Sequence, residues 1–412
     1  MKYVIQHIKQ LVNTRTNSIV VRGLELSQLP IIDNAFIVVE NGIIQSYGSM
    51  HELSAEHMLG AELIDAAGAS ILPCWCDSHT HLVFAASREE EFVHKIKGLT
   101  YAEIAAKGGG ILNSAQKIAQ ATEDELYFQA MARLQDLMKL GTGAIEIKSG
   151  YGLNTENELK ILRVIKRIKE TAPIPVKASF LGAHTYPLAF KENHDGYIDQ
   201  IIHEMLPIIA KEQLADYIDV FCEEGFFSVE ETHRICNAGL SFGLKSKIHA
   251  NQLHASGGVE LGVQIGAVSV DHLETMNEAA IQALSKSNTI GTMLPTAAFF
   301  LRMPYQPARE LIRANAALAV ASDYNPGSSP SGNMNFVVAL SCIQLKLLPE
   351  EAINAATING AFAMELDKEV GSITIGKRAN LIFTQPIPSL AYLPYSFGTN
   401  LIDKVMINGR FI

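Results

Sequence analysis

Asp77-Ser78-His79-Thr80-His81 is the stretch that decides the fold, and it follows directly on an apolar run at 70–76. Side chains alternate between the two faces of a strand, so His79 and His81 point the same way. Two imidazoles on one face, about 6–7 Å apart along the strand, can bind one metal ion. The apolar run predicts a buried strand that delivers the histidine pair to its end. Other parts of the chain must then supply the remaining ligands.

Strand and helix patterns alternate through the middle of the chain. Short runs rich in Val, Ile, Ala and Leu, typical of strands buried on both faces, lie at 71–79, 143–148, 174–180, 216–221, 245–249, 267–271, 289–293 and 318–322. Helix starts of the capping-box type are predicted at Thr122-x-x-Glu125, Thr155-x-x-Glu158, Ser228-x-x-Glu231 and Thr275-x-x-Glu278. Strand–helix units repeated over about 300 residues predict an α/β fold, a (β/α)8 TIM barrel. An open doubly wound sheet is the alternative, but no G-x-G-x-x-G follows the first strand.

The two ends of the chain have a different pattern. Residues 1–65 and 366–412 consist of short β-type runs separated by turn signals such as Glu40-Asn41-Gly42. We expect both ends to form one small β-sandwich together, as a composite domain. The barrel domain is then expected at residues 66–365.

Composition narrows the class of protein. Of 412 residues, 48% are hydrophobic and 18% charged, as in a compact soluble enzyme. The net charge of −10, without a dense basic patch, argues against nucleic acid and anionic membranes as partners. We find no apolar run of transmembrane length and no signal-peptide core. Five cysteines without a C-x-x-C pair predict no disulfide framework, so we expect a cytoplasmic protein.

Polar side chains follow most of the predicted strands, at the strand ends where barrel enzymes carry their chemistry. The simplest assembly binds one metal ion through His79, His81, His249 and Asp323, and leaves one coordination position for water. Such a metal lowers the pKa of the water and makes a hydroxide nucleophile near neutral pH. Three imidazoles and one carboxylate suit zinc and also iron, so we expect one zinc or iron ion per subunit.

Two of the strand-end residues are predicted to move protons. Asp323 can touch both metal and water and shuttle a proton, and His272 is placed to act as general base or as electrophile at the substrate oxygen. A second metal would usually need a bridging Lys at the fourth strand, which ends instead in Cys222-Glu223. We therefore favour one metal, and Glu223 as a bridge to a second one stays open.

At these residues the chain resembles the amidohydrolase superfamily and, within it, the imidazolonepropionases of histidine degradation. The resemblance runs over nearly the whole chain. It is carried by the local sequences at 77–84, 87–92, 108–111, 148–153, 181–184, 271–274 and 322–330. The last of these motifs is specific to the family, whereas H-x-H is specific only to the superfamily.

The resemblance implies hydrolysis of 4-imidazolone-5-propanoate to N-formimidoyl-L-glutamate, in which activated water attacks the lactam carbonyl and a ring C–N bond breaks. It also implies substrate contacts by Arg88, Tyr151, His184, Gln252 and Ser328, and product contacts by Tyr151, Asn325 and Gly327. Arg88 suits the propionate because a guanidinium can grip a carboxylate with two hydrogen bonds. Its alternative is an ion pair within residues 88–91. Gln252 stands where some members carry Glu, and an amide can only hydrogen-bond.

Other interpretations stay open. Another cyclic amidohydrolase or a deaminase could use the same ligands, and a degenerate barrel could serve as a scaffold, although such a barrel should have lost ligands. Gly108-Gly109-Gly110 is interpreted either as a lid hinge or as the stop of a helix. As partners we expect a small-molecule substrate and a second copy of the chain, in a homodimer.

Overall fold

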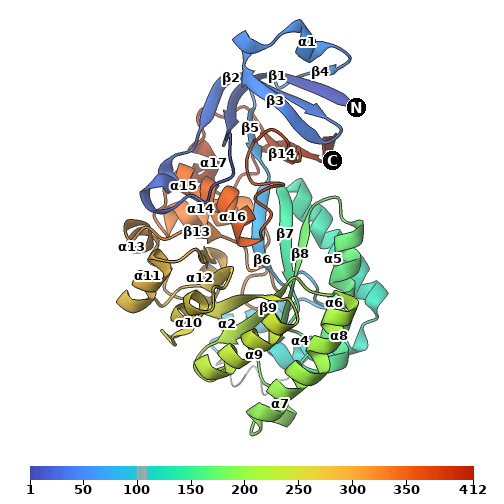
Figure 1. The fold of residues 1–412 in the computed structure, drawn as a ribbon, viewed down its shortest axis with the longest axis vertical. Coiled ribbons are helices and arrows are strands. Elements are labelled where there is room, and N and C mark those ends of the chain that lie inside the picture. The colour runs from blue at the N-terminus through green and yellow to red at the C-terminus, as the bar shows by residue number, and fades with distance from the viewer. Residues whose placement is uncertain (100–102, 104–108) are drawn as a thin grey trace.

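The structure is a computed structural model and describes residues 1–99, 103 and 109–412 (Figure 1). Within this part of the chain, two separate sheets carry the fold, one at the top of Figure 1 and the other, the barrel, below it. None of the helices found there is both long and apolar enough to cross a membrane.

The larger body is a barrel of eight parallel strands that follow one another in chain order. They are β6 (Trp75–Thr80), β7 (Thr142–Lys148), β8 (Val176–Ala183), β9 (Tyr217–Cys222), β10 (Lys245–Ala250), β11 (Ser269–His272), β12 (Ile290–Met293) and β13 (Leu318–Val320). The chain after β13 returns to the first strand, where the Asp323 N–H donates to the His79 carbonyl at 3.0 Å. The His81 N–H in turn donates to the Tyr324 carbonyl at 2.9 Å. These bonds close the ring and confirm the predicted (β/α)8 TIM barrel.

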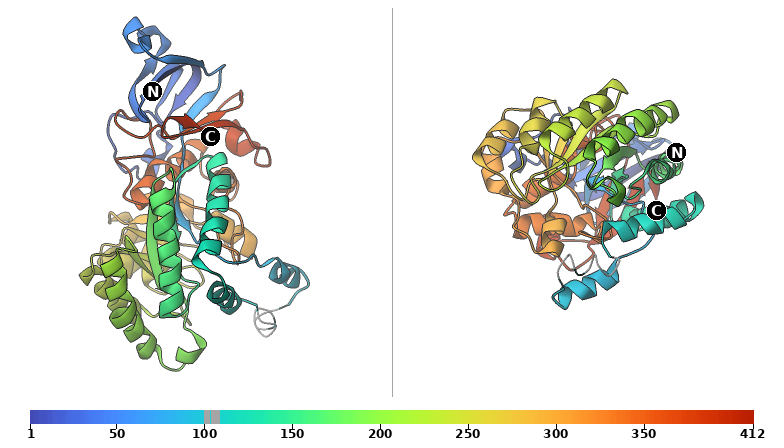
Figure 2. Two further views of the ribbon diagram at one scale, coloured as in Figure 1. Left: turned by 90° about the vertical axis from the view of Figure 1, so that its right-hand side faces the viewer. Right: turned by 90° about the horizontal axis from the view of Figure 1, so that it is seen from below.

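Helices connect the barrel strands and surround them (Figure 2). The first of these along the chain are α2 (Glu89–Ile96), α4 (Ile111–Gln120), α5 (Glu123–Lys139), α6 (Thr155–Thr171), α7 (His194–Gln200), α8 (Leu206–Glu212) and α9 (Val229–Ser241). Further along the chain follow α10 (Gly258–Gln264), α11 (Glu278–Ser285), α12 (Pro295–Leu301), α13 (Ala308–Arg313), α14 (Met334–Ile343), α15 (Pro349–Ala356) and α16 (Ile358–Ala363). The main hydrophobic core joins strand and helix side chains such as Ile147 of β7 and Ile165 of α6.

Two of the four predicted capping boxes are confirmed and two are wrong. Thr122 and Ser228 cap α5 and α9, each accepting from the N–H of the Glu three residues on. By contrast, α6 begins after Asn154 and α11 after Asn277, each capped by its asparagine. An asparagine side chain is as good an N-cap as serine or threonine, so in both helices a nearby Asn is the N-cap residue in place of the predicted Thr.

Strands from both chain ends form the second sheet, in the order β16-β15-β14-β5-β1-β2-β3 with β4 beside β1. Their bounds are β1 (Lys2–Val12), β2 (Ile31–Glu40), β3 (Ile43–Ser49), β4 (Glu62–Asp65), β5 (Ser70–Pro73), β14 (Leu381–Thr384), β15 (Ile402–Ile407) and β16 (Arg410–Phe411). One buried cluster packs Ile5 and Ile37 against Leu381 and Met406. The composite β structure expected from the two termini is therefore confirmed, as one continuous sheet.

The predicted strand at 71–79 is two strands in the structure. β5 pairs with β1 and β14 in the terminal sheet, whereas β6 pairs with β7 in the barrel. The change happens at one residue, because the Cys74 N–H donates to Asn380 O and the Trp75 N–H to Gly141 O, both at 2.9 Å. Both strands are buried and largely apolar, so the sequence shows one continuous apolar run and gives no sign of the change of sheet. The domain boundaries at 65/66 and 365/366 stay predictions, and β5 belongs to the terminal sheet.

Candidate metal centre

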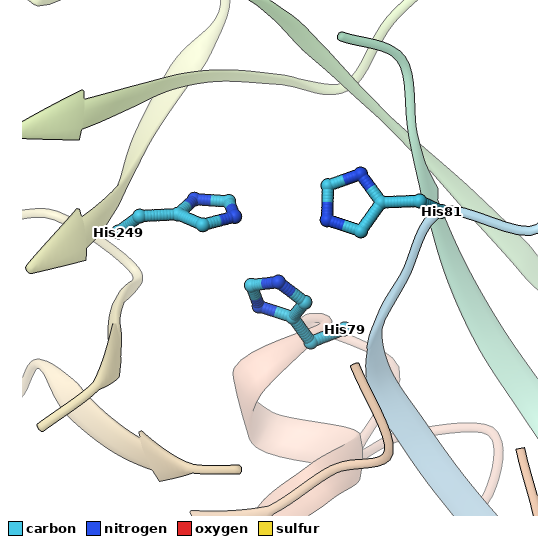
Figure 3. Close-up of side chains that lie close together, drawn as sticks. All are labelled: His79, His81 and His249. Carbon is cyan, nitrogen blue, oxygen red and sulfur yellow. The ribbon is translucent and has the colours of Figure 1, made fainter. Parts of the chain in front are cut away.

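Three imidazoles from two strands meet at the carboxyl end of the barrel (Figure 3). His79 lies on β6, His81 directly follows it, and His249 lies on β10. The His79 ring centroid is 4.5 Å from that of His249 and 5.5 Å from that of His81. One nitrogen of each ring lies within 4.8 Å of the others, and all three residues are buried. The rings point toward one another, as ligands of one ion would.

Asp323 brings a carboxylate to the same place. Its Oδ1 lies 3.5 Å from Nε2 of His79 and 3.6 Å from Nε2 of His81. Its backbone has a φ of +52°, a conformation that non-glycine residues seldom adopt and that collects at functional sites. This turn places the carboxylate over the barrel mouth directly after β13.

The inward-facing atoms of this group have no hydrogen-bond partner. His79 Nε2, His249 Nε2 and Asp323 Oδ1 are all buried and unpaired within the described part of the chain. Burying polar atoms without partners is costly, so such atoms call for a ligand. Imidazole nitrogens and a carboxylate oxygen are donors that suit a divalent metal. The residues present therefore fit one metal ion.

His272, on β11, lies beside the three histidines. Its ring centroid is 5.6 Å from that of His79 and 5.3 Å from that of His249. Its φ of +90° is another unusual backbone conformation at this site. Burial acts to lower the pKa of His272, but the Glu274 carboxylate, 3.4 Å from its Nδ1, contributes to a net shift upward. The raised pKa favours the protonated, hydrogen-bond-donating form of this imidazole.

A carboxylate lies behind two of the three converging histidines. Asp271 Oδ2 is 2.7 Å from Nδ1 of His79, and Asp219 Oδ1 is 3.0 Å from Nδ1 of His249. A carboxylate at Nδ1 fixes the tautomer that leaves Nε2 free to bind a metal. Burial, and then the neighbouring Lys148 cation, hold the pKa of His79 well below its ordinary value. The lowered pKa favours the neutral form of the His79 ring, and in both rings the hydrogen bond at Nδ1 leaves Nε2 free.

These two carboxylates belong to a layer of buried charged side chains. Lys148 Nζ donates to Glu146 Oε1 and to Asp219 Oδ2, both at 2.7 Å, and lies 3.5 Å from Asp271 Oδ2. Lys247 donates to the other oxygen of Glu146. We call these five residues, Glu146, Lys148, Asp219, Lys247 and Asp271, the buried charge layer. Sequence reasoning missed their role, although charged residues alternating with apolar ones within core strands were an available signal.

Most of the predicted substrate-binding residues line one small cavity, together with His81, His249 and Asp323. This cavity, of about 60 Å³, is lined by His81, Tyr151, His184, Phe221, His249, Gln252, His272, Asp323, Asn325 and Ser328. Arg88 and Gly327 are not among its lining residues. The cavity thus brings together residues from seven barrel strands or the loops that follow them.

The loop after β7 holds Tyr151 against the histidines. The Tyr151 ring centroid is 5.7 Å from that of His81, and His184 stacks on His81 with centroids 5.5 Å apart. Glu158 of α6 fixes this loop, because its carboxylate accepts from the N–H groups of Gly150 and Gly152 at 3.1 and 2.6 Å. The carboxylate predicted to complete a capping box therefore positions a site loop instead.

The loop after β13 is tied together by Asn325. Its Oδ1 accepts from the N–H groups of Gly327 and Ser328, both at 2.8 Å, and its Nδ2 donates to Ser328 Oγ at 2.7 Å. Ser328 Oγ donates to Asp323 Oδ2 at 3.1 Å. Ser328 thus holds one oxygen of Asp323 and leaves the other facing the histidines.

Arg88 makes the ion pair that the sequence left as its alternative role. Its Nε and Nη2 donate to the two oxygens of Glu91 at 2.9 and 2.6 Å. Its remaining nitrogen, Nη1, lies against Gly327, where a side-chain Cβ would collide with it. Glu91 thus holds one edge of the guanidinium, while Nη1 reaches the loop that carries Asn325 and Ser328.

Two other sequence interpretations concern Glu223 and the glycines at 108–110. Glu223 is not placed to bridge metals, because its oxygens accept from the N–H groups of Glu224 and Leu253 at 2.9 and 2.7 Å, and it joins neither histidine-containing group in the described residues. Gly108 lies outside the described residues. Gly110 precedes α4 with a φ of +83°, and its N–H donates to Glu91 at 2.8 Å. Both interpretations of the glycine run stay predictions.

Comparisons with known proteins agree with this geometry. The profile of the Amidohydrolase family matches residues 70–412. The chain is 56% identical to an imidazolonepropionase of Flavobacterium johnsoniae, covering 99% of both chains, and 52% identical to one of Christiangramia forsetii, covering 100% of both. Among solved structures, a triazine hydrolase variant has a TM-score of 0.75 at 14% identity, covering 100% of this chain and 94% of that one. Escherichia coli guanine deaminase has a TM-score of 0.73 at 13% identity, covering 100% and 99%. These two structures share the fold alone.

Proposed function

Because the chain belongs to the imidazolonepropionase family of amidohydrolases, we infer that it hydrolyses 4-imidazolone-5-propanoate to N-formimidoyl-L-glutamate. One observation carries this proposal: His79, His81, His249 and Asp323 converge from distant parts of the chain beside His272. A cyclic amide needs an activated water, a group that polarises its carbonyl and a proton for the leaving nitrogen. The converging residues are of the types that supply all three.

We assign His79, His81, His249 and Asp323 as ligands of one zinc or iron ion. The unpaired Nε2 atoms of His79 and His249 and the unpaired Oδ1 of Asp323 support this assignment. When bound, such an ion lowers the pKa of water and polarises the amide carbonyl.

The proton transfers fall to two residues of the chain. Asp323 accepts the proton of the attacking water and returns it to the ring nitrogen as the C–N bond breaks. Burial raises the pKa of Asp323, which favours its taking up that proton. His272 donates a hydrogen bond to the carbonyl oxygen, a role that its raised pKa supports. Water adds across the C–N bond, so the overall reaction is balanced without another reactant.

The remaining cavity residues hold the organic part of the substrate. In this proposal Tyr151, His184, Gln252 and Ser328 contact the ring, and Tyr151, Asn325 and Gly327 hold the product. Arg88 binds the propionate through the nitrogen that Glu91 leaves free. All of these residues except Arg88 and Gly327 line the cavity beside the proposed metal ligands, which supports the arrangement.

Arg88→Ala is expected to raise KM by about ten- to hundredfold, the usual weight of hydrogen bonds to a charged group, with a smaller change in kcat. Steady-state kinetics measure both constants. Glu90→Ala, at an exposed position on the same helix, is the matched control and should behave as wild type. An unchanged KM in the Arg88 variant would refute its assignment to the propionate.

Gly327→Ala is expected to raise KM by about tenfold, because the added methyl group displaces the Arg88 guanidinium without removing it. The flexible end of Arg88 can move aside, so the fold should persist, and thermal unfolding checks that it does. Gly398→Ala adds the same methyl group in open space and serves as control. If Gly327→Ala keeps the wild-type KM, as the control Gly398→Ala should, Arg88 does not reach the substrate through this loop.

Turnover by the purified protein tests the function itself. We expect 4-imidazolone-5-propanoate to lose its ring chromophore, N-formimidoyl-L-glutamate to appear in equal amount, and no ammonia to be released. Release of ammonia from this or another heterocycle would favour the deaminase alternative. We further propose that the chain acts in the cytoplasm as a homodimer, and sedimentation of the purified protein measures its mass in solution.

A further inference from the structure

Lys148 occupies the centre of the buried charge layer. Its ammonium group lies 2.7 Å from Asp219 Oδ2 and 3.5 Å from Asp271 Oδ2, and it also donates to Glu146 at 2.7 Å. The side chains of all these residues have an exposed fraction of 0%. An ammonium group has three N–H donors, so one lysine can serve three carboxylates at once.

The two aspartates bound by Lys148 are those that orient ligand histidines. Asp219 uses Oδ2 for Lys148 and Oδ1 for His249 Nδ1. Asp271 Oδ2 contacts both His79 Nδ1 and Lys148, while its Oδ1 accepts from Ser269 Oγ at 2.6 Å. A change at Lys148 would therefore reach His79 and His249 together, although these two residues lie on different strands.

The charges of the layer do not cancel. Lys148 and Lys247 contribute two positive charges, whereas Glu146, Asp219 and Asp271 contribute three negative charges, which leaves one negative charge in excess. Without Lys148, the excess would rise to two, on aspartates that the missing ammonium no longer separates. Buried like charges repel strongly, so the carboxylates would turn away from each other and from their histidines.

We propose that Lys148 is a positioning residue of the metal centre: its single ammonium holds both carboxylates that aim His79 and His249 at the metal. The inference rests on the metal-dependent function proposed above. It goes further by assigning the geometry of two ligands to one residue that touches neither ligand nor substrate.

Lys247 offers a matched control on the neighbouring part of the same layer. It is equally buried and also pairs with Glu146, and its Nζ lies 5.1 Å from the centroid of the Tyr217 ring. Within the described residues it makes no ion pair with Asp219 or Asp271. Loss of Lys247 therefore removes a buried cation without releasing the two aspartates.

The test compares Lys148→Met with Lys247→Met in the full-length protein. Zinc affinity of the folded, metal-free protein is measured by competition with a chelator, and the visible absorption of the cobalt-substituted protein reports ligand geometry. We expect zinc binding about 10–100-fold weaker in Lys148→Met, with a changed cobalt spectrum, because outer partners of metal ligands have effects of this size. Lys247→Met should keep the wild-type affinity and spectrum. Wild-type affinity in Lys148→Met, or an equal loss in Lys247→Met, would overturn the proposal.

A second variant keeps the proposal testable if Lys148→Met alone does not fold. Lys148→Met combined with Glu146→Gln removes one charge of each sign and keeps the excess of the layer at one. It should bind zinc as weakly as the single variant, and tight binding would contradict the proposal. Failure of both variants to fold even with zinc would assign Lys148 to folding instead, and would equally overturn it. Turnover and zinc binding by the wild-type protein, measured first, test the proposed function separately.

Discussion

His272→Ala is expected to lower kcat by about a hundred- to ten-thousandfold, the range typical for loss of a general acid or base, while the metal content stays at the wild-type level. The physical reason is its position. His272 lies beside His79 and His249, and although burial acts to lower its pKa, Glu274 and other carboxylates shift it upward, which favours a proton donor. The measurement is kcat together with metal per chain in the same preparation.

His254→Ala is the control for this prediction. His254 follows the same barrel strand as His249, but its side chain is 53% exposed and pairs with Glu223, away from the cavity. It should keep wild-type activity. If His272→Ala loses its metal along with its activity, His272 is a ligand and the assignment of roles is wrong.

Asp323→Asn is the second change with a large expected effect. Asparagine adopts left-handed backbone conformations readily, so the φ of +52° can persist, and its oxygen can still accept from Ser328. What is lost is the charge, hence both a metal ligand and the proton acceptor. We expect kcat to fall by about a hundred- to ten-thousandfold even with metal in excess.

Kinetics at saturating metal separate the two losses in Asp323→Asn, since added metal can restore a weakened ligand set but cannot restore a proton acceptor. Asp403→Asn, at a half-exposed position in the terminal sheet, controls for the loss of one carboxylate. Wild-type kcat in Asp323→Asn at full metal occupancy would show that another group moves the proton.

The convergence of His79, His81, His249 and Asp323 could be predicted from the sequence because their positions follow from elementary geometry. The period of two in a strand puts His79 and His81 on one face, and parallel strands in a barrel bring all their carboxyl ends to one rim. His249 and Asp323 lie at such ends, on or just after β10 and β13. The local pattern and the barrel architecture were therefore enough to predict that these residues lie close together.

The residues that support the ligands could not be predicted in this way. The pairing of Asp271 with His79 and of Asp219 with His249 depends on register between strands, which no local pattern reveals. The role of Glu158 could not be predicted from local pattern either. Its spacing from Thr155 is that of a capping box, but its carboxylate is drawn to the unpaired N–H groups of a loop.

Titration of the metal-free protein with Zn²⁺ or Fe²⁺, with turnover of 4-imidazolone-5-propanoate recorded at each addition, tests the central claim most directly. If the four converging residues hold one ion that the reaction requires, activity starts near zero, rises in proportion to bound metal and stops rising at one ion per chain. Full activity in protein stripped of metal, or a plateau reached only at two ions per chain, would contradict the account.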